Sequence, residues 1–587
     1  MKKIRLLVLV FIAMYHSSWA QWSVLMDDKK YNETEFFLYQ RFTQKEWDAS
    51  NFAKPEDMKW FLDARYGMFV HFGLNSYVNK DMSWPIVRNR KMPDHGQGAY
   101  PDQAWQVEWP SKFKLEKFNA KEWVNIAQRS GMKYMTIVVK HHDGFHLWDT
   151  QFSDFKITIT PFGRDYLKEL IDACHAAGLP VGLYYSQRDW YHPDYEPIDT
   201  NTVHSISDPP YYESLPGKRV TAGAKHKKYI DYQFKAIREL LTKYGKIDIF
   251  WFDAVSWGGM FTAEMWDSER LTRMIRELQP GIVINNRASL PGDFDTPEQR
   301  IGMYQERPWE SAMTLNGSWG YDPEHKIKPV KNLVREMLTA AAGNGNVLIS
   351  WGAKFDGAFD SPQIDSLLAI GHWLKQYGDY YYGTRGGPWM PTKEYGAVHK
   401  ANKVYLYLFD QAMETIKLPI LKHNRLRRFH RVGDDKALNW KEANNNYVFT
   451  DIKTTDPIVQ IFELEFDSPI QETVGDRTYS IFDSPTYGKL IYEKKLNKVP
   501  RRRITVDLKK ISKVTGIGLY GNIENLIVEY SINNQDWEKL SVKQGLSQQE
   551  LSLNSFMAGM QVPGKEIRYL RIYGKPNPEV NIKIFSQ

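Results

Sequence analysis

The sequence alternates amphipathic stretches with short apolar runs from about residue 56 to residue 383. Helical periodicity marks the amphipathic stretches, and a glycine follows each of them closely, as expected for helix ends. The predicted helices span residues 119–130, 165–177, 226–244 and 271–279. Near-continuous apolar runs predict strands of a parallel sheet that is covered on both faces. The predicted strands span residues 67–73, 134–140, 181–186, 247–253, 282–287 and 347–351.

Polar residues at the strand ends favour a barrel over an open sheet. Nearly every predicted strand finishes, at its C-terminal end, in a charged or hydrogen-bonding group, and this is typical of a (β/α)₈ barrel. An open sheet would gather such groups near one switch point, and no nucleotide-binding glycine motif follows the first strand. The groups are His71, residues 140–143, residues 185–186, Asp253 and residues 286–287.

The pattern changes after residue 383, where short strands separated by turn residues replace the helical periodicity. This predicts one or two all-β sandwiches behind the α/β, (β/α)₈-like (TIM) barrel. We therefore expect a signal peptide over residues 1–20, a catalytic barrel over 21–385, a β-sandwich over 386–470 and a second β-sandwich over 471–587.

The N-terminus has the features of a secretory signal. Lys2, Lys3 and Arg5 precede an apolar run over residues 6–15, and residues 18–20 fit a small-x-small cleavage site before Gln21. The apolar run is too short for a transmembrane helix, which needs about 20 residues. We expect a protein without a membrane span that is exported to the bacterial periplasm or beyond.

Composition narrows the classes of function. Of the 587 residues 42% are hydrophobic and 14% aromatic, which indicates a globular protein. The formal net charge is +7, and subtracting the three signal-peptide cations leaves +4. Basic clusters at residues 422–431 and 501–503 are read as solvated faces, so we expect no nucleic-acid partner. The aromatic residues suit either sugar rings or buried cores.

Two carboxylates stand where barrel chemistry is expected. Asp253 ends an apolar strand, where a carboxylate is costly to bury unless it is paired or functional, although it could also cap the next helix. Glu298 follows the next strand in a loop that contains Pro297. A pair of this kind can supply the nucleophile and the acid/base of a glycoside hydrolase.

Other chemistries are less well supported. His141 and His142 are adjacent on a strand and should point to opposite faces, so hydrogen bonds to a hydroxylated ligand are favoured over a metal. No G-x-S-x-G motif is present, and Cys174 lies inside a predicted helix, where it resembles a small core residue. We expect neither a metal nor an organic cofactor.

Taken together, the strand-end motifs resemble the retaining α-L-fucosidases of glycoside hydrolase family 29. They run in family order over about residues 61–383: 66–73 (YGMFVHFG), 140–148 (KHHDGFHLW), 182–186 (GLYYS), 244–253 (YGKIDIFWFD), 283–287 (VINNR), 296–298 (TPE), 309–310 (WE), 317–321 (GSWGY) and 343–346 (GNGN).

The resemblance implies that Asp253 is the nucleophile of a secreted exo-α-L-fucosidase and that Glu298 is the acid/base, with Glu306 and Glu310 as competing carboxylates. It also implies a substrate that is a fucosylated oligo- or polysaccharide. The residues that it assigns to the sugar pocket are His71, Trp84, His141, His142, Tyr185, Trp251 and Arg287.

Departures from the family pattern leave alternatives open. Phe72 stands where Trp is usual, and Ser83 precedes Trp84 where Glu is usual. Small Ala254 beside the nucleophile could leave room for the extra hydroxyl of L-galactose, because an apolar pocket rejects an added hydroxyl poorly. An α-L-galactosidase acting on algal galactan is one alternative, and a non-catalytic carbohydrate-binding protein on a hydrolase scaffold is another.

The last domain has a resemblance of its own. Residues 504–508, 514–519, 528–531, 536–538 and 568–571 look like a discoidin-type β-sandwich, a fold that often binds carbohydrate. Trp537 could be a platform for a sugar, although a tryptophan at this place in the fold is more often part of the core.

Overall fold

The computed structural model describes most of the chain after residue 43. The predicted signal peptide and Ala254 lie outside the described residues. Those residues are 24–25, 44–86, 100–199, 220–253, 262–301, 304–392, 394–434, 436–471, 474, 489–496, 502–520, 523–540, 558–576 and 580–586.

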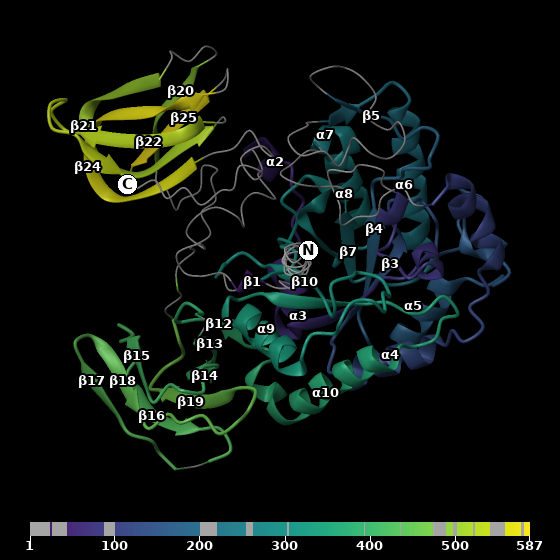
Figure 1. Ribbon diagram of the computed structural model, residues 1–587, viewed down its shortest axis with the longest axis horizontal. Coiled ribbons are helices and arrows are strands. Elements are labelled where there is room, and N and C mark those ends of the chain that lie inside the picture. Colours follow the sequence, from purple (N-terminus) through teal and green to yellow (C-terminus); the bar gives the residue numbers. More distant parts are fainter. Residues whose placement is uncertain are drawn as a thin grey trace, which may run out of the picture.

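A seven-stranded sheet forms the centre of the molecule, and every neighbouring pair of strands in it is parallel (Figure 1). Because the strands are parallel, all of their carboxyl ends lie at one edge of the sheet. In spatial order the strands are β10 (Glu310–Thr314), β11 (Asn346–Trp351), β2 (Tyr66–Val70), β3 (Met135–Lys140), β4 (Val181–Ser186), β7 (Ile249–Asp253) and β8 (Val283–Ile284).

The segment over residues 293–299 closes the gap between the two outer strands β8 and β10. Parallel bridges join Phe294 to Asn285, just after β8, and Glu298 to Ala312 in β10. The peptide N–H of Gln299 also donates to the carbonyl of Ala312. The backbone contacts therefore continue around a closed, TIM-like ring.

Helices surround the sheet (Figure 1). Asn119 and Asp165 cap the N-termini of α4 and α5 by accepting from the peptide N–H of Glu122 and of Lys168. Caps of this kind satisfy backbone donors that no helical carbonyl can reach. The helices are α3 (Pro55–Ala64), α4 (Ala120–Arg129), α5 (Tyr166–Ala176), α6 (His226–Lys243), α7 (Ala263–Trp266), α8 (Ser268–Leu278), α9 (Val330–Ala342) and α10 (Ser361–Tyr377), besides the short α2 (Gln44–Asp48).

Alternation along each strand divides the core into two parts. Phe69, Val138, Tyr184, Trp251 and Leu348 belong to a cluster that fills the inside of the ring. Their strand neighbours, among them Val139, Tyr185 and Phe252, pack in the larger cluster between the sheet and the helices. A strand side chain therefore reaches either the barrel interior or the helix layer, and its position in the alternation decides which.

The predicted strands and helices of the barrel correspond closely to those observed. The prediction and the structure differ at two strands whose apolar pattern is weak. The strand predicted over residues 282–287 is short, because Asn286–Ala288 turns into a 3₁₀ helix. Strand β10 was not predicted, because Glu310, Ser311 and Thr314 make it resemble a polar loop.

Two sheets that share one core follow the barrel. The five-stranded sheet contains β12 (Arg385–Gly386), β13 (Tyr395–Lys400), β14 (Lys403–Leu408), β19 (Gln460–Phe466) and β16 (Leu426–Arg431) in spatial order. The smaller sheet contains β15 (Thr415–Pro419), β18 (Asn446–Thr450) and β17 (Trp440–Ala443). Phe429, Phe449 and Phe462 meet between the sheets. Arg335 of α9 donates to the carbonyls of Phe409 and Ile458, which holds this unit against the barrel.

The C-terminal part of the chain forms a separate six-stranded antiparallel sheet with its own apolar cluster. In spatial order its strands are β20 (Lys489–Leu496), β25 (Val580–Ser586), β21 (Arg502–Tyr520), β24 (Ala558–Pro576), β22 (Ile523–Ser531) and β23 (Glu538–Leu540). Two small sheets complete the fold: β1 (Val24–Leu25) pairs with β9 (Arg300–Ile301), and β5 (Pro197–Asp199) pairs with β6 (Val220–Ala222).

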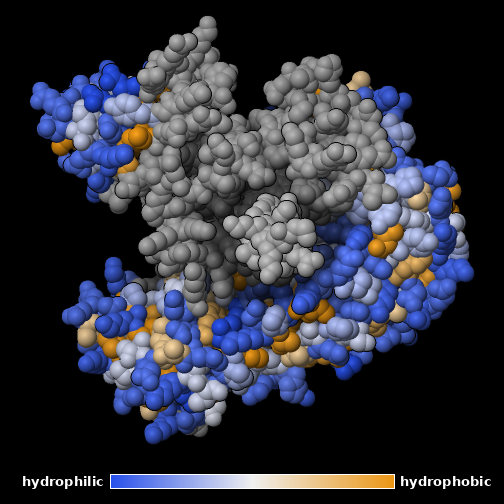
Figure 2. Space-filling model, viewed as in Figure 1, coloured by the Kyte–Doolittle hydropathy of each residue, from blue (hydrophilic) through white to orange (hydrophobic). Residues whose placement is uncertain are grey.

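The surface of the described residues is largely polar. On the face shown in Figure 2, hydrophilic residues predominate over the barrel and over the two sheets that follow it (residues 385–466), with scattered apolar residues between them. Among the described residues, none of the helices is long and apolar enough to cross a bilayer.

Asp293 secures the seam where the ring closes. Its carboxylate accepts from the Nη2 of Arg276 at 2.8 Å, from the peptide N–H of Ile284 at 2.7 Å and from that of Ala53 at 2.6 Å. Replacing Asp293 by Ala leaves a buried guanidinium without its counter-charge, which typically costs about 3–5 kcal/mol. We expect Asp293→Ala to lower the urea midpoint of barrel unfolding, followed by tryptophan fluorescence, by an amount that corresponds to this loss.

Asp172→Ala is the matched control, because the ion pair between Asp172 and Lys168 is exposed. Exposed pairs contribute about 0–1 kcal/mol, so this variant should unfold close to the wild type. Equal midpoints for the two variants would show that Asp293 does not secure the seam.

Candidate active site

The side chains that follow the strands meet at the carboxyl edge of the ring. Asp253 is the last residue of β7, and His141 and His142 come directly after β3. Arg287 lies in the 3₁₀ turn after β8, and Glu298 lies in the closing segment beside β10. Strands far apart in the sequence thus bring these five residues to one place.

Both carboxylate oxygens of Asp253 accept a hydrogen bond. Oδ1 accepts from the Nη1 of Arg287 at 3.0 Å, and Oδ2 accepts from the hydroxyl of Tyr184 at 2.6 Å. The side chain of Asp253 is 17% exposed, so a ligand at the carboxyl edge can reach it. The two donors fix the plane of the carboxylate.

Arg287 connects the two predicted catalytic carboxylates. Its Nη2 donates to Oε2 of Glu298 at 3.0 Å and to the carbonyl of Thr296, while Nη1 holds Asp253. The guanidinium lies 4.7 Å from the centre of the Trp251 ring, at a distance that suits a cation–π contact. Burial opposes the charge, but Asp253 and Glu298 outweigh it and raise the pKa of Arg287 above its ordinary value.

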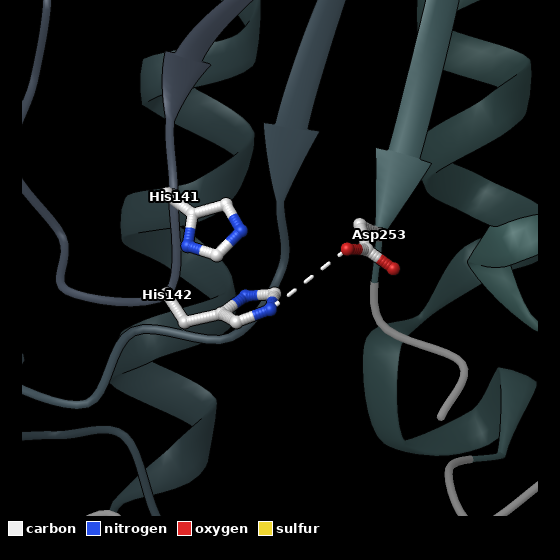
Figure 3. A group of neighbouring side chains, drawn as sticks. All are labelled: His141, His142 and Asp253. Atoms are coloured by element: carbon white, nitrogen blue, oxygen red, sulfur yellow. Dashed lines mark ion pairs between the residues drawn. The ribbon is translucent and has the colours of Figure 1, made fainter. Parts of the chain in front are cut away.

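Three buried histidines border the site and are neutral. Burial lowers the pKa of His141 to about 3 and that of His71 and His142 well below the ordinary range. Nε2 of His142 lies 3.8 Å from Oδ2 of Asp253, and Figure 3 shows that both rings present one nitrogen toward that carboxylate. Neutral imidazoles can donate or accept, which suits sugar hydroxyls.

Among the described residues, one group of side chains could hold a metal: His141, His142 and Asp253, whose ligand atoms lie within 4.8 Å of one another. Tyr184 and Arg287 already occupy the oxygens of Asp253, and the Arg287 cation would repel a second cation there. The arrangement fits a neutral hydroxylated ligand better than a metal. The expectation that the two adjacent histidines point to opposite faces is wrong, because both lie beyond the end of β3, where strand alternation has stopped, and their ring centres are 3.9 Å apart.

Aromatic rings form the walls of the site. Trp84 lies with its ring centre 5.2 Å from that of His142 and 5.7 Å from that of Trp190. Trp319 lies 5.2 Å from the ring of His71. The sequence did not single out Trp319 as a wall residue, since tryptophan content alone cannot distinguish a wall from a core.

Tyr184, rather than Tyr185, reaches the site. Tyr185 is fully buried in the helix-facing core, with Trp148 and Phe250 beside its ring and the ammonium of Lys140 4.8 Å from the ring centre. The prediction that Tyr185 lines the sugar pocket is therefore wrong, and the neighbouring residue Tyr184 takes this place. Strand alternation could have identified Tyr184, because Trp251, in register with it on β7, faces the same side.

The two competing carboxylates lie in different surroundings. Glu306 is an exposed residue of the loop before β10. Glu310 begins β10 and is fully buried in the barrel, where it accepts from the hydroxyl of Tyr134 and, at 3.1 Å, from the Nε1 of Trp251. Because Glu310 lies at the amino end of its strand, it is separated from the edge where Asp253 stands.

The residues that depart from the expected family pattern occupy distinct places. Phe72 packs against Phe113, Trp123 and Tyr166 in the helix layer, so it does not form the pocket wall. The Ser83 hydroxyl bonds to Nδ1 of His141 and so supports the site from behind.

Comparisons with known proteins point to one family. A model of the α-L-fucosidase family matches residues 19–379. An α-L-fucosidase of Dictyostelium discoideum is 26% identical over 395 residues, which cover 62% of this chain and 80% of that protein. The human plasma α-L-fucosidase is 27% identical over 421 residues, which cover 67% of this chain and 85% of that protein.

Solved structures show the same fold. The α-L-fucosidase isoenzyme 1 of Paenibacillus thiaminolyticus has a TM-score of 0.59 and 30% identity, and the match covers 70% of this chain and 99% of that chain. An α-L-fucosidase of Bacteroides thetaiotaomicron, trapped as a covalent intermediate, has a TM-score of 0.61 and 22% identity over 74% of this chain and 100% of that chain. At that identity the second likeness supports the fold alone.

Glu310 makes the stability of the barrel depend on pH. Burial raises the pKa of this carboxyl from 4.5 to about 7, against the opposing hydrogen bonds from Tyr134 and Trp251. The folded state keeps a proton that the unfolded chain releases, so this stabilisation is complete below about pH 4.5 and is lost as the pH rises through about 7.

We expect the wild type to lose up to about 3 kcal/mol of unfolding free energy relative to Glu310→Gln between about pH 5 and pH 8. Urea denaturation of both proteins across this range measures the difference. If the unfolding free energies of the two proteins changed with pH in parallel, Glu310 would not be the source of this pH dependence.

Proposed function

The chain belongs to the α-L-fucosidase family of glycoside hydrolases, and from this premise we propose that it cleaves terminal α-L-fucosyl residues from glycans by double displacement, with retention. Asp253 is the proposed nucleophile, and Glu298 is the proposed acid/base.

The observation that carries the proposal is the guanidinium shared by the two carboxylates. Arg287 holds Asp253 through Nη1 and Glu298 through Nη2, each at 3.0 Å. Two carboxylates on one guanidinium cannot be much more than about 8 Å apart, whereas a catalytically idle pair could lie at any separation. This closeness favours a hydrolase over a non-catalytic carbohydrate-binding protein.

The geometry suits two chemical steps. In the first, Asp253 attacks the anomeric carbon and forms an ester to the sugar, while the acid form of Glu298 gives its proton to the departing oxygen. In the second, Glu298 takes a proton from water, the water oxygen attacks the same carbon, and the Asp253 carboxylate leaves. Retention follows from two inversions.

The exposure of the two carboxylates fits these roles. The Glu298 side chain is 40% exposed, so it can meet both a departing glycan and incoming water, whereas Asp253, at 17%, lies deeper. The neutral histidines and the tryptophan walls beside Asp253 suit the hydroxyls and the ring of one terminal sugar. These features support an exo-acting enzyme whose substrate is a fucosylated oligo- or polysaccharide.

We also propose that the protein is exported and that its C-terminal unit is a discoidin-like, carbohydrate-binding module. The basic and apolar N-terminus supports export. The antiparallel sheet with a separate core is compatible with the module. The Arg571 guanidinium lies 3.6 Å from the centre of the Trp537 ring, so one face of this ring is covered and only the other could stack on a sugar.

Variants of the two carboxylates should separate their roles. Asp253→Ala should lower kcat on any α-L-fucoside by about 10³-fold or more, because the attacking group is removed. Glu298→Gln should lower kcat/KM by about 10²–10⁴-fold on a natural glycan but far less on 4-nitrophenyl α-L-fucoside, whose leaving group needs no proton. Steady-state kinetics on both substrates measure the effect.

Glu306→Gln serves as the comparison, since Glu306 is an exposed carboxylate in the loop before β10. A leaving-group dependence seen in Glu306→Gln and not in Glu298→Gln would overturn the assignment of Glu298. Full activity in Asp253→Ala would overturn the double displacement itself.

A side-by-side assay tests the sugar. We expect kcat/KM for 4-nitrophenyl α-L-fucoside to exceed that for the matching α-L-galactoside by at least about tenfold, the usual discrimination for one group in an apolar pocket. A preference for the galactoside would support the α-L-galactosidase alternative. Binding of either sugar without turnover would support the non-catalytic alternative.

A further inference from the structure

Each of the three histidines at the site is held at Nδ1 by a serine hydroxyl. His71 meets Ser350 at 3.0 Å, and His142 meets Ser186 at 2.6 Å. His141 meets Ser83. The serines come from different parts of the chain, on β11, on β4 and in the loop after β2.

A neutral imidazole carries one N–H, and the partner at Nδ1 decides which nitrogen holds it. Each serine hydroxyl either donates to Nδ1 or accepts from it, and its other hydrogen-bond partners decide which. This in turn decides whether the remaining nitrogen, Nε2, offers a ligand an N–H or a lone pair. Burial keeps all three rings neutral, since it lowers the pKa of each of them far below the ordinary range.

Ser186 has its proton committed elsewhere. Its hydroxyl lies 3.0 Å from the carbonyl of Arg188 and 3.4 Å from that of Asp253, and carbonyl oxygens can only accept. The single O–H therefore points to a carbonyl, and Ser186 accepts from Nδ1–H of His142. Nε2 of His142 is left with a lone pair.

Ser350 is arranged in the same way. Its hydroxyl donates to the carbonyl of Trp319 at 2.6 Å, so it accepts from Nδ1–H of His71. Nε2 of His71 is also left with a lone pair.

Ser83 has the opposite arrangement. Its peptide N–H points to Nδ1 of His141 at 3.4 Å, and a peptide N–H can only donate. The Ser83 hydroxyl meets the same nitrogen, and among the described residues no carbonyl competes for its proton. Nδ1 of His141 therefore carries the lone pair, and the proton is on Nε2.

We propose that Ser83, Ser186 and Ser350 are positioning residues that fix the histidine tautomers, so that the site offers one donor, on His141, and two acceptors, on His142 and His71. The proposal rests on the proposed function for the nature of the ligand. It predicts that the sugar hydroxyl at His141 accepts, whereas the hydroxyls at His142 and His71 donate.

The surroundings of Asp253 agree with the donor assigned to His141. The Nε2–H of His141 faces the side of the carboxylate (Figure 3), where a donor is favourable. The lone pair of His142 lies 3.8 Å from Oδ2 of Asp253, too far for a hydrogen bond, and a sugar hydroxyl could donate to this nitrogen.

Neutron diffraction from deuterium-exchanged crystals of the unliganded protein at neutral pD tests the tautomers directly. We expect deuterium on Nδ1 of His71 and of His142, and on Nε2 of His141. Deuterium on Nε2 of His142 or of His71, on Nδ1 of His141, or on both nitrogens of any of these rings would overturn the proposal.

Inhibition constants of L-fucose analogues test the consequence. Fluorine accepts weakly and cannot donate, so a deoxyfluoro sugar should bind like the deoxy sugar at positions that meet His142 or His71. At the position that meets His141, the deoxyfluoro sugar should bind several-fold more tightly than the deoxy sugar. Equal losses for fluorine and hydrogen at every position would overturn the predicted donor at His141.

Serine variants test the positioning role. Ser186→Ala and Ser350→Ala should each lower kcat/KM by about tenfold, the effect of one hydrogen bond. The matching threonine variants, which keep the hydroxyl, should recover most of the loss. Ser130→Ala, at a fully buried serine that ends α4, is the control and should keep full activity. Full activity in both Ser186→Ala and Ser350→Ala would overturn the positioning role of these serines.

The outcomes also separate this proposal from the proposed function. If L-fucose neither binds nor is released from glycans, while the neutron maps show the expected deuterium positions, the function fails and the tautomers stand. If the enzyme is active and the deuterium positions are reversed, the tautomers fail and the function stands.

Discussion

The site depends on one buried cation, the guanidinium of Arg287. Burying this charge is unfavourable, and the ion pairs with Asp253 and Glu298 and the ring of Trp251 compensate for it. The partners come from two parts of the ring: Asp253 and Trp251 from β7, and Glu298 from the closing segment. Asp253 and Glu298 can therefore share this guanidinium only when the ring closes, which links the site to the completeness of the fold.

Trp251 connects Arg287 to the interior of the barrel. Its ring supports Arg287 on one side and stacks on Tyr184, whose hydroxyl holds the other oxygen of Asp253. Its Nε1 donates to Glu310 at the amino end of the ring. Glu310 is thus connected to both groups that hold Asp253, namely Tyr184 and Arg287, although it lies too deep to meet a substrate. This connection explains why a carboxylate occupies an otherwise apolar interior, where it would be costly without two donors.

The sequence was sufficient for most of the barrel, because apolar strands and capped helices are local signals. It also predicted that Asp253, Arg287 and the two adjacent histidines lie together, since strand ends in a barrel converge, and the structure brings them together. Three features were not identified in this way. The polar strand β10 lacks an apolar pattern. Tyr184 and Tyr185 are chemically identical and differ only in their phase along the strand. Glu298, Glu306 and Glu310 differ only in depth, which depends on how the ring closes.

The charge balance of the site argues for a neutral ligand. The single cation of Arg287 faces two carboxylates, Asp253 and Glu298, and the three histidines carry no charge. A further carboxyl, Asp81, accepts from the peptide N–H of Trp319, and burial together with the charge of Glu298 raises its pKa to about 7. Near neutral pH these groups of the described site together carry no net positive charge with which to attract an anionic group. Selectivity must come from hydrogen bonds to hydroxyls and from the tryptophan walls, which is the chemistry that distinguishes one neutral sugar from another.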